Sequence, residues 1–242
     1  MADRSHALEP GVRASTTTRR SLVKGMAWAA PAMLVSTAAP AINASLLTCV
    51  TLDWSTFPIQ SGSKLQNGGS VTLGGAPVTV SLSGRTNHAD TYTRNAGALR
   101  LRSDNRLTVS AADTLQTLTI AFGAPVRHVS LRVYDLDQDI YDLGIQQFRD
   151  EVYIPAGAAA PTSVTRGADV IGAGTPGDRF RAREELMGDM PGRPDQEGAA
   201  KHGVVLEWDG PLTEIQVAYV QGLRRGNFPT PTIWISNVDF CV

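Results

Sequence analysis

The chain has 242 residues, of which 42% are hydrophobic and 19% charged, and its formal net charge at neutral pH is −1. Its 22 lysines and arginines are scattered among 23 acidic residues and form no run long enough to follow a phosphate backbone. We therefore expect no nucleic-acid partner.

The N-terminal segment has the order of an export signal, in which a charged region precedes an apolar one. Arg19 and Arg20 form an adjacent pair, and residues 25–35 behind them carry no charge. Alanines and Pro31 make this stretch too weakly apolar for a comfortable membrane span, so we interpret it as a removable signal. The alternative is a retained N-terminal membrane helix.

A cleavage site is expected after Ala44, where small residues accumulate, and Ser45 would then begin the mature chain. Lipid attachment at Cys49 is disfavoured because Thr48 stands where a small residue is required. The leader resembles those of proteins exported by the twin-arginine route in high-GC Gram-positive bacteria. The resemblance implies the twin-arginine export machinery as a partner, a secreted or cell-surface location and no stable membrane insertion after cleavage.

Residues 45–242 have a length that sustains one core, and we predict a single domain. Two cysteines, Cys49 and Cys241, lie near the two ends of this domain. In an exported protein the simplest interpretation is an intramolecular disulfide bond, which for so long a loop contributes at most about 4 to 5 kcal/mol. Two free thiols or an intermolecular bond are the alternatives.

Apolar residues alternate with polar ones along this domain, and no long segment has a helical apolar stripe. Glycine and proline turns separate the alternating segments. The pattern predicts an all-β fold, an antiparallel β-sandwich or jelly roll. The predicted strands carry these apolar residues in chain order: Val50, Leu52 and Trp54; Val71 and Leu73; Val78, Val80 and Leu82; Leu99 and Leu101; Leu107 and Val109; Leu118, Ile120 and Phe122.

Residues 118–133 and 204–219 correspond to one another, since each consists of a strand, a turn with proline and a second strand. Proline suits these turns because it fixes φ and lacks an N–H group. Two such hairpins facing each other are predicted to form the core of a sandwich. Its central residues would be Phe122, Leu131, Trp208 and Val217.

An acidic loop follows the first of these segments. Asp135 and Asp137 point to the same side if the strand continues through them, and Asp150, which opens the next strand, can return to the same end. Ca²⁺ prefers carboxylate oxygens, so the three residues predict a structural calcium site, although the loop lacks the EF-hand pattern. The alternative is a solvated acidic loop whose aspartates cap turns.

Two further segments are interpreted as loops. Residues 184–202 lose the apolar periodicity and are predicted to form a long mobile loop. Residues 172–177 match the letters of the dinucleotide-binding motif G-x-G-x-x-G, but Pro176 prevents a helix from opening there. We therefore expect no dinucleotide site.

Exposed aromatic rings would offer another route to function, because such rings stack on the apolar faces of sugars. The alternation of apolar residues places Trp54 and Trp208 on the core-facing side of their predicted strands. Trp234 and Tyr141 are the better candidates for a ligand-binding surface. Trp234 also lies on the same predicted strand face as apolar residues near the C-terminus, so packing in the core is its alternative role.

The second half of the domain resembles a loose class of uncharacterised bacterial surface β-sandwiches, in which a proline turn precedes a D-x-D loop and a D-x-V strand. The matching residues are Pro125, Asp135, Asp137, Asp150 and Val152. The ending, residues 233–240, is similar to the last strand of lectin-like and carbohydrate-binding sandwiches. The resemblance implies the sandwich fold and leaves the ligand open.

The sequence contains no signature of a hydrolytic site: no nucleophile elbow, no H-E-x-x-H zinc motif and no catalytic Cys/His pattern. The function that follows is a non-catalytic extracellular or surface-associated module that binds a glycan or a protein. The alternative is a secreted hydrolase that acts on polysaccharide through a carboxylate pair, for instance Glu207 and Asp150.

Overall fold

The computed structural model describes residues 47–58, 68–84, 94–95, 97–102, 114–141, 145–183, 194–224 and 231–242. The predicted leader, with Arg19, Arg20 and the cleavage site after Ala44, lies outside these residues. So do the predicted strand around Leu107 and the first part of the predicted loop 184–202.

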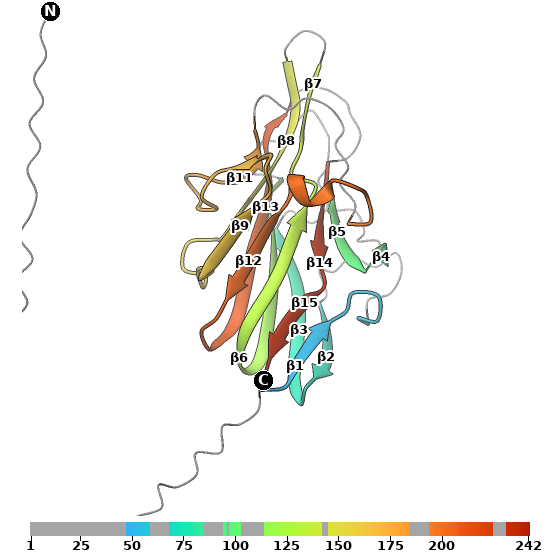
Figure 1. Ribbon diagram of the computed structural model, residues 1–242, viewed down its shortest axis with the longest axis vertical. Coiled ribbons are helices and arrows are strands. Elements are labelled where there is room, and N and C mark those ends of the chain that lie inside the picture. The colour runs from blue at the N-terminus through green and yellow to red at the C-terminus, as the bar shows by residue number, and fades with distance from the viewer. Residues whose placement is uncertain are drawn as a thin grey trace, which may run out of the picture. The chain divides into compact units, whose positions relative to one another are not determined.

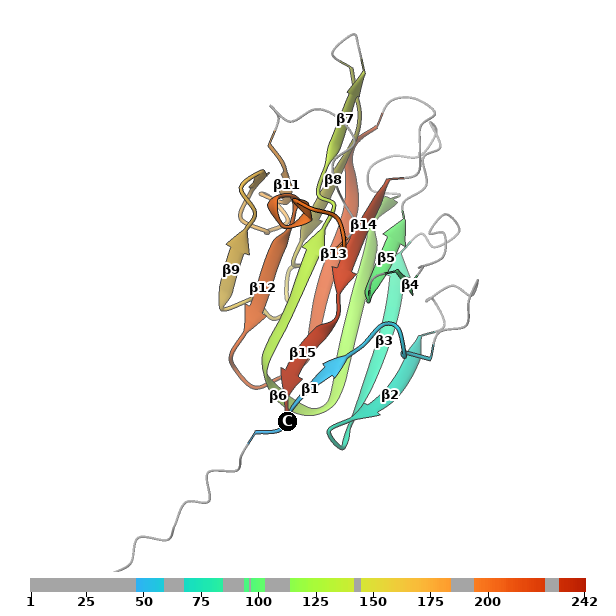
Figure 2. The same ribbon diagram turned by 45° about the vertical axis from the view of Figure 1, so that its right-hand side comes forward.

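The strands form two layers of antiparallel sheet that share one long strand, β6 (Gln116–Tyr134). β6 bends near its middle, so that its first arm lies in one layer and its second arm in the other (Figures 1 and 2). The predicted antiparallel β-sandwich is confirmed.

The first layer contains the second arm of β6 with β1 (Cys49–Leu52), β4 (Arg94–Asn95), β5 (Ala98–Arg102), β9 (Ser163–Arg166), β12 (Val204–Trp208), β14 (Thr232–Ser236) and β15 (Val238–Cys241). The second layer contains the first arm of β6 with β2 (Gly69–Leu73), β3 (Ala76–Gly84), β7 (Gln138–Tyr141), β8 (Ile145–Tyr153), β10 (Val170–Ile171), β11 (Phe180–Ala182) and β13 (Leu212–Arg224). A short 3-10 helix, η3 (Ala199–His202), precedes β12. In the part of the chain that the structure describes, no helix is long and apolar enough to cross a membrane.

The order of strands places β8 towards one edge of the second layer. That order is β2, β3, β6, β13 and β8, and both β7 and β11 pair with β8 on the side away from β13. In the first layer, β6 lies between β12 on one side and β14 and β15 on the other. β8 therefore has three neighbouring strands, β13 on one side and β7 and β11 on the other.

In each of the two proline-turn segments, the two strands lie in different layers and do not pair with each other. We call these segments arches, and the prediction of hairpins is wrong. The second arm of β6 pairs with β12 in the first layer, and the first arm pairs with β13 in the second layer, where Ile120 lies opposite Ile215. Each segment therefore crosses from one layer to the other. The turn of β6 explains this: His128 has a left-handed φ of 51°, which redirects the chain, and Pro125 has no N–H group to continue a ladder.

The core lies between the layers, and both arches contribute to it as predicted. Phe122, Leu131, Trp208 and Val217 are each at most 4% exposed. Burying one such side chain contributes about 1.5–3 kcal/mol to folding. Trp54 is also buried, and its Nε1 donates to the carbonyl oxygen of Ser236 at 2.6 Å. The buried indole N–H group therefore has a hydrogen-bond acceptor.

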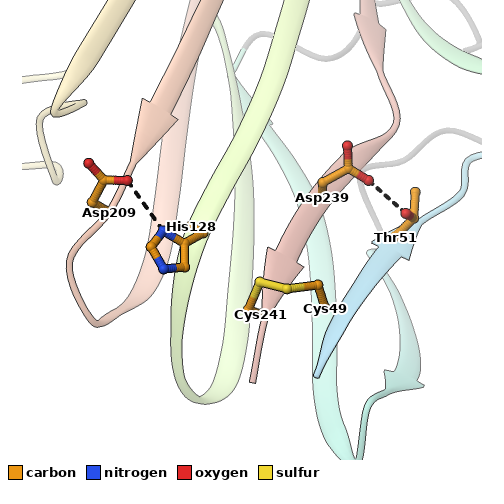
Figure 3. The surroundings of a disulfide bond; sticks show 6 residues. All are labelled: Cys49, Thr51, His128, Asp209, Asp239 and Cys241. Atoms are coloured by element: carbon orange, nitrogen blue, oxygen red, sulfur yellow. Dashed lines mark hydrogen bonds and ion pairs between the residues drawn. A yellow bond between two sulfur atoms is a disulfide. The ribbon is translucent and has the colours of Figure 1, made fainter. Parts of the chain in front are cut away.

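A disulfide bond joins Cys49 to Cys241, as predicted (Figure 3). The two cysteines lie opposite each other in the antiparallel pair of β1 and β15, with Cα atoms 3.9 Å apart. Thr48 and Val242 exchange backbone hydrogen bonds in both directions beside the bond, which sets the register. The disulfide thus ties the first described strand to the last.

Candidate functional site

Strand β8 carries polar side chains on both faces. Asp150 is 0% exposed and points into the sandwich, whereas Arg149 and Glu151 lie on the outer face because successive strand residues alternate. The polar residues form two groups. The buried acidic cluster comprises Asp135, Asp137, Asp150, Tyr219 and Gln221, and the arginine hollow is lined by Arg149, Glu151, Pro176, Gly177, Asp178, Arg179 and Arg181.

Asp150 is the hydrogen-bonding centre of the buried acidic cluster. Its Oδ1 accepts from the hydroxyl of Tyr219 at 2.6 Å and from Nε2 of Gln221 at 2.5 Å. Nε2 of Gln221 also donates to the Tyr219 hydroxyl at 2.7 Å. The backbone N–H of Asp150 donates to the carbonyl oxygen of Asp137, which holds the acidic loop against β8.

The pKa of Asp150 is raised from 3.8 to about 7, mainly by burial and also by the nearby charge of Asp135. A hydrogen bond between the carboxyl groups of Asp137 and Asp150 acts in the opposite direction. Two carboxyl groups can share a hydrogen bond only when one of them is protonated, because an ionised carboxylate has no donor. Oδ2 of Asp150 is buried and accepts from no donor among the described residues. Burial, together with the negative charge of Asp150, also raises the pKa of Tyr219 well above 10.0.

The three predicted calcium ligands are neighbours in this cluster. Asp135 interacts with Asp150 through its charge, and Asp137 through a hydrogen bond. No group of three or more His, Cys, Asp or Glu residues in the described ranges is arranged to hold a metal ion. The raised pKa of Asp150 favours its neutral form, and that form reduces the repulsion that a cation would otherwise have to balance. Calcium binding stays a prediction.

The predicted aromatic surface is not present at Trp234. Its side chain is only 4% exposed, and the guanidinium of Arg100 lies over the ring at 5.7 Å from the centroid. The residue is buried because β14 packs on both faces, so it offers no open platform for a sugar. The backbone of Tyr141 ends β7, and its side chain lies outside the described residues.

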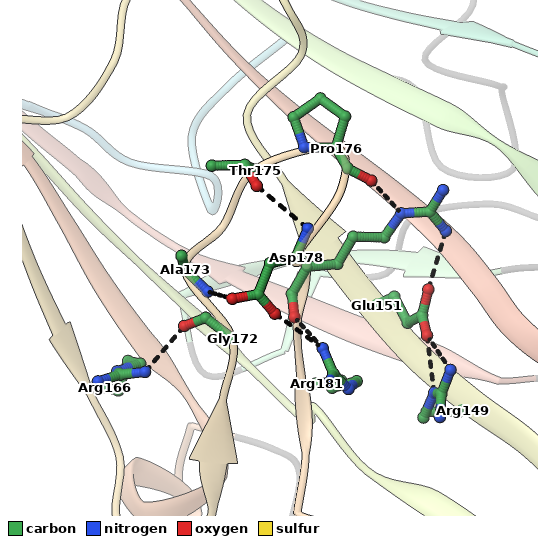
Figure 4. A network of polar contacts seen from close by, with 10 residues as sticks. Arg149, Glu151, Arg166, Gly172, Ala173, Thr175, Pro176, Asp178 and Arg181 are labelled. Carbon is green, nitrogen blue, oxygen red and sulfur yellow. Dashed lines mark hydrogen bonds and ion pairs between the residues drawn. The ribbon is translucent and has the colours of Figure 1, made fainter.

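Glu151 anchors the arginine hollow (Figure 4). Its side chain is 6% exposed. Oε1 accepts from Nε of Arg149 at 2.7 Å and from Nη2 of the same arginine at 2.5 Å. Oε2 accepts from Nη1 of Arg179 at 2.8 Å. The Arg179 guanidinium also lies 5.0 Å from the centroid of the Tyr153 ring. One acid therefore holds two guanidinium groups in defined positions.

A tight turn, residues 172–178, forms the other wall. Asp178 closes it: Oδ2 accepts from the backbone N–H of Ala173 at 3.0 Å, and Oδ1 accepts from Nη1 of Arg181 at 3.2 Å. The backbone N–H of Asp178 in turn donates to Oγ1 of Thr175. This segment carries the letters of the dinucleotide motif, and strand β11 follows it, so the helix that such a motif requires is not there.

A glycine in the neighbouring strand makes room for the carboxylate of Glu151. A Cβ atom on Gly222 would lie 2.0 Å from Oε1 of Glu151, closer than any non-bonded contact allows. The absent side chain lets the carboxylate lie against the backbone of β13, where both arginines can reach it. The resulting hollow has a volume of about 440 Å³.

Sequence reasoning missed the arginine hollow. The signal that was available is charge at alternate positions: Arg149 and Glu151 share one face of a strand, and so do Arg179 and Arg181. Their assembly depends on the pairing of β8 with β11, in which Arg181 lies opposite Glu151. Nothing local in the sequence indicates that pairing.

Glu207 and Asp150 do not face a common groove. Asp150 is buried inside the sandwich, whereas Glu207 lies on the outer side of β12 in the other layer, between the buried residues Leu206 and Trp208. The two carboxyl groups of a glycosidase must flank the same bond of the substrate. The structure does not bring this pair together in that way.

No family model matches the sequence, and no curated protein is significantly similar to it. Among solved structures, the chain is similar to the adhesin domain of PrgB from Enterococcus faecalis, with 14% identity and a TM-score of 0.38. The match covers 67% of this chain and 56% of that chain. A similarity this low supports no conclusion about the ligand or the activity.

Proposed function

We propose that this protein is an exported, non-catalytic β-sandwich that binds an extracellular ligand, a glycan or a protein, at the arginine hollow. The observation that carries the proposal is a solvent-open hollow of about 440 Å³ in which Arg149, Arg179 and Arg181 are each held by a carboxylate. Side chains that are already ordered lose little freedom on binding, and this favours affinity.

The rival function is a secreted hydrolase that acts on polysaccharide. It needs two carboxyl groups about 5 to 10 Å apart that both reach the substrate. In the hollow, Glu151 and Asp178 are engaged by arginines, and on the other face of β8 the carboxyl group of Asp150 is covered. These contacts favour binding over hydrolysis.

A binding screen run beside a hydrolase panel separates the two functions. We expect the purified protein to retain a glycan, cell-wall or protein probe and to leave polysaccharide substrates intact. Arg179→Ala should weaken the retention, whereas Arg127→Ala, at an exposed arginine outside the hollow, should not. Release of new reducing ends from any polysaccharide would favour the hydrolase, and retention of no probe would contradict the binding function.

The disulfide bond fits a protein of the cell surface or exterior, because such bonds persist in oxidising compartments. For the route, we propose twin-arginine export followed by removal of residues 1–44. The support is the adjacent pair Arg19 and Arg20 before an uncharged stretch.

Changing Arg19 and Arg20 together to Lys is expected to leave the precursor in the cytoplasm, because a receptor reads the pair as an address. Immunoblots of cell and medium fractions measure this, and a change of Arg13 to Lys, outside the pair, serves as the matched control. Normal secretion of the double variant would remove the twin-arginine assignment.

A further inference from the structure

We propose that the arginine hollow recognises the anionic group of an acidic carbohydrate, a carboxylate or sulfate carried on a sugar. This inference rests on the proposed binding function and names the ligand class for the same site.

The hollow has more guanidinium donors than its own acids use. Three arginines meet two acids, Glu151 and Asp178. Among the described residues, Nη1 of Arg149 and Nη2 of Arg179 have no partner, and Arg181 uses only its Nη1. None of these nitrogens is among the buried unpaired atoms, so each reaches solvent. The geometry offers a small anion several N–H groups at once.

Guanidinium chemistry indicates an oxyanion as the recognised group. Parallel N–H groups match the two oxygens of a carboxylate or sulfate, whereas an ammonium group acts only as a point charge. The carboxylate of Glu151 already binds two of these guanidinium groups: Oε1 accepts from Nε of Arg149 at 2.7 Å, and Oε2 accepts from Nη1 of Arg179 at 2.8 Å. The remaining donors lie on the same groups and are therefore ordered before a ligand binds.

The lining favours a sugar over a protein surface. Among the described residues of the hollow, Pro176 is the only one with an apolar side chain, whereas the centre of a protein interface is usually apolar and aromatic. The carboxylates of Glu151 and Asp178 can accept from sugar hydroxyls beside the anion. A volume of about 440 Å³ lies within the range of small-molecule sites and holds one or two sugar units.

Charge over the whole chain argues against a long polyanion held by general attraction. The formal net charge is −1, so the chain as a whole does not attract an anion, and attraction depends on local groups such as the arginines of the hollow. An anion presented on a sugar that enters the hollow meets this requirement. An extended phosphate backbone needs a longer basic track.

The test measures binding of the purified protein to four immobilised probes: polygalacturonate, heparin, neutral dextran and single-stranded DNA. We expect binding to polygalacturonate, heparin or both, and the comparison of the two distinguishes carboxylate from sulfate. Arg179→Ala should weaken this binding about tenfold to a hundredfold, the loss of one charge-assisted hydrogen bond. Arg179→Lys should recover only part of it, because Lys keeps the charge and loses the planar fork.

Arg179 is a usable position because Glu151 keeps Arg149 as a partner in the variant, so no buried carboxylate is left unpaired. Unchanged melting of each variant confirms this, and Arg127→Ala should bind as the unmodified protein does. Equal binding to dextran or DNA, or full binding by Arg179→Ala, would overturn the acidic-carbohydrate assignment while the binding function stands. If none of these probes binds and the wider screen also retains nothing, both proposals are wrong.

Discussion

Replacing Cys49 and Cys241 together by Ser is expected to lower the free energy of unfolding by up to about 5 kcal/mol, because the bond closes a loop across 192 residues of sequence. The mechanism acts mainly on the unfolded chain, which gains conformational freedom when the crosslink is removed. β1 and β15 retain their ladder, including the backbone bonds between Thr48 and Val242. Urea titration of both proteins measures the difference.

A matched variant isolates the crosslink from its surroundings. Thr51 donates to Oδ1 of Asp239 at 2.6 Å in the same strand pair, on an exposed surface (Figure 3). Thr51→Ala should cost only about 0.5–1.5 kcal/mol, the usual contribution of one hydrogen bond. A double Ser variant no less stable than Thr51→Ala would show that the disulfide contributes little, and two alkylatable thiols in the unreduced protein would remove the bond altogether.

Replacing Asp150 by Asn is expected to flatten the dependence of stability on pH. The pKa of Asp150 is about 7 in the folded protein and 3.8 in its ordinary environment, so the folded state binds more protons between these values. Stability from this group is therefore fully present below about pH 4 and is lost as the pH rises through about 7. Asn mimics the protonated carboxyl group, since it accepts from Tyr219 and can donate to Asp137.

The variant should match the unmodified protein at about pH 4 and melt at a higher temperature near pH 8, with both measured in excess chelator. Glu197→Gln is the control, because Glu197 is exposed and makes no ion pair with any described residue, so its replacement should leave the profile unchanged. Parallel profiles for the unmodified protein and Asp150→Asn would show that folding does not raise the pKa of Asp150.

The same melting series with millimolar Ca²⁺ in place of chelator tests the predicted calcium site. Binding to the folded state alone should raise the melting temperature with the logarithm of free Ca²⁺. Asp150→Asn should lose that increase, because the amide removes a charged ligand. A melting temperature that does not change between chelator and Ca²⁺ would contradict the calcium site. Protonation would then be what reduces the repulsion among the carboxyl groups of the cluster.

Local patterns in the sequence determined the all-β class, most of the core and the cysteine pair. Alternation with period two is a property of each strand by itself, so Val78, Ile120 and Leu131 could be assigned to an inner face without knowledge of their neighbours. The disulfide followed from counting, since two cysteines allow only one intramolecular pairing.

The tertiary structure alone decided how those strands meet. Two strands joined by a proline turn can pair with each other or cross between layers, and the sequence pattern is the same in both cases. For the same reason, local pattern could not show that both faces of β14 are covered around Trp234, or that burial raises the pKa of Asp150. The arginine hollow needs β8, β11 and Gly222 of β13 in one register, and register depends on contacts between segments far apart in the chain.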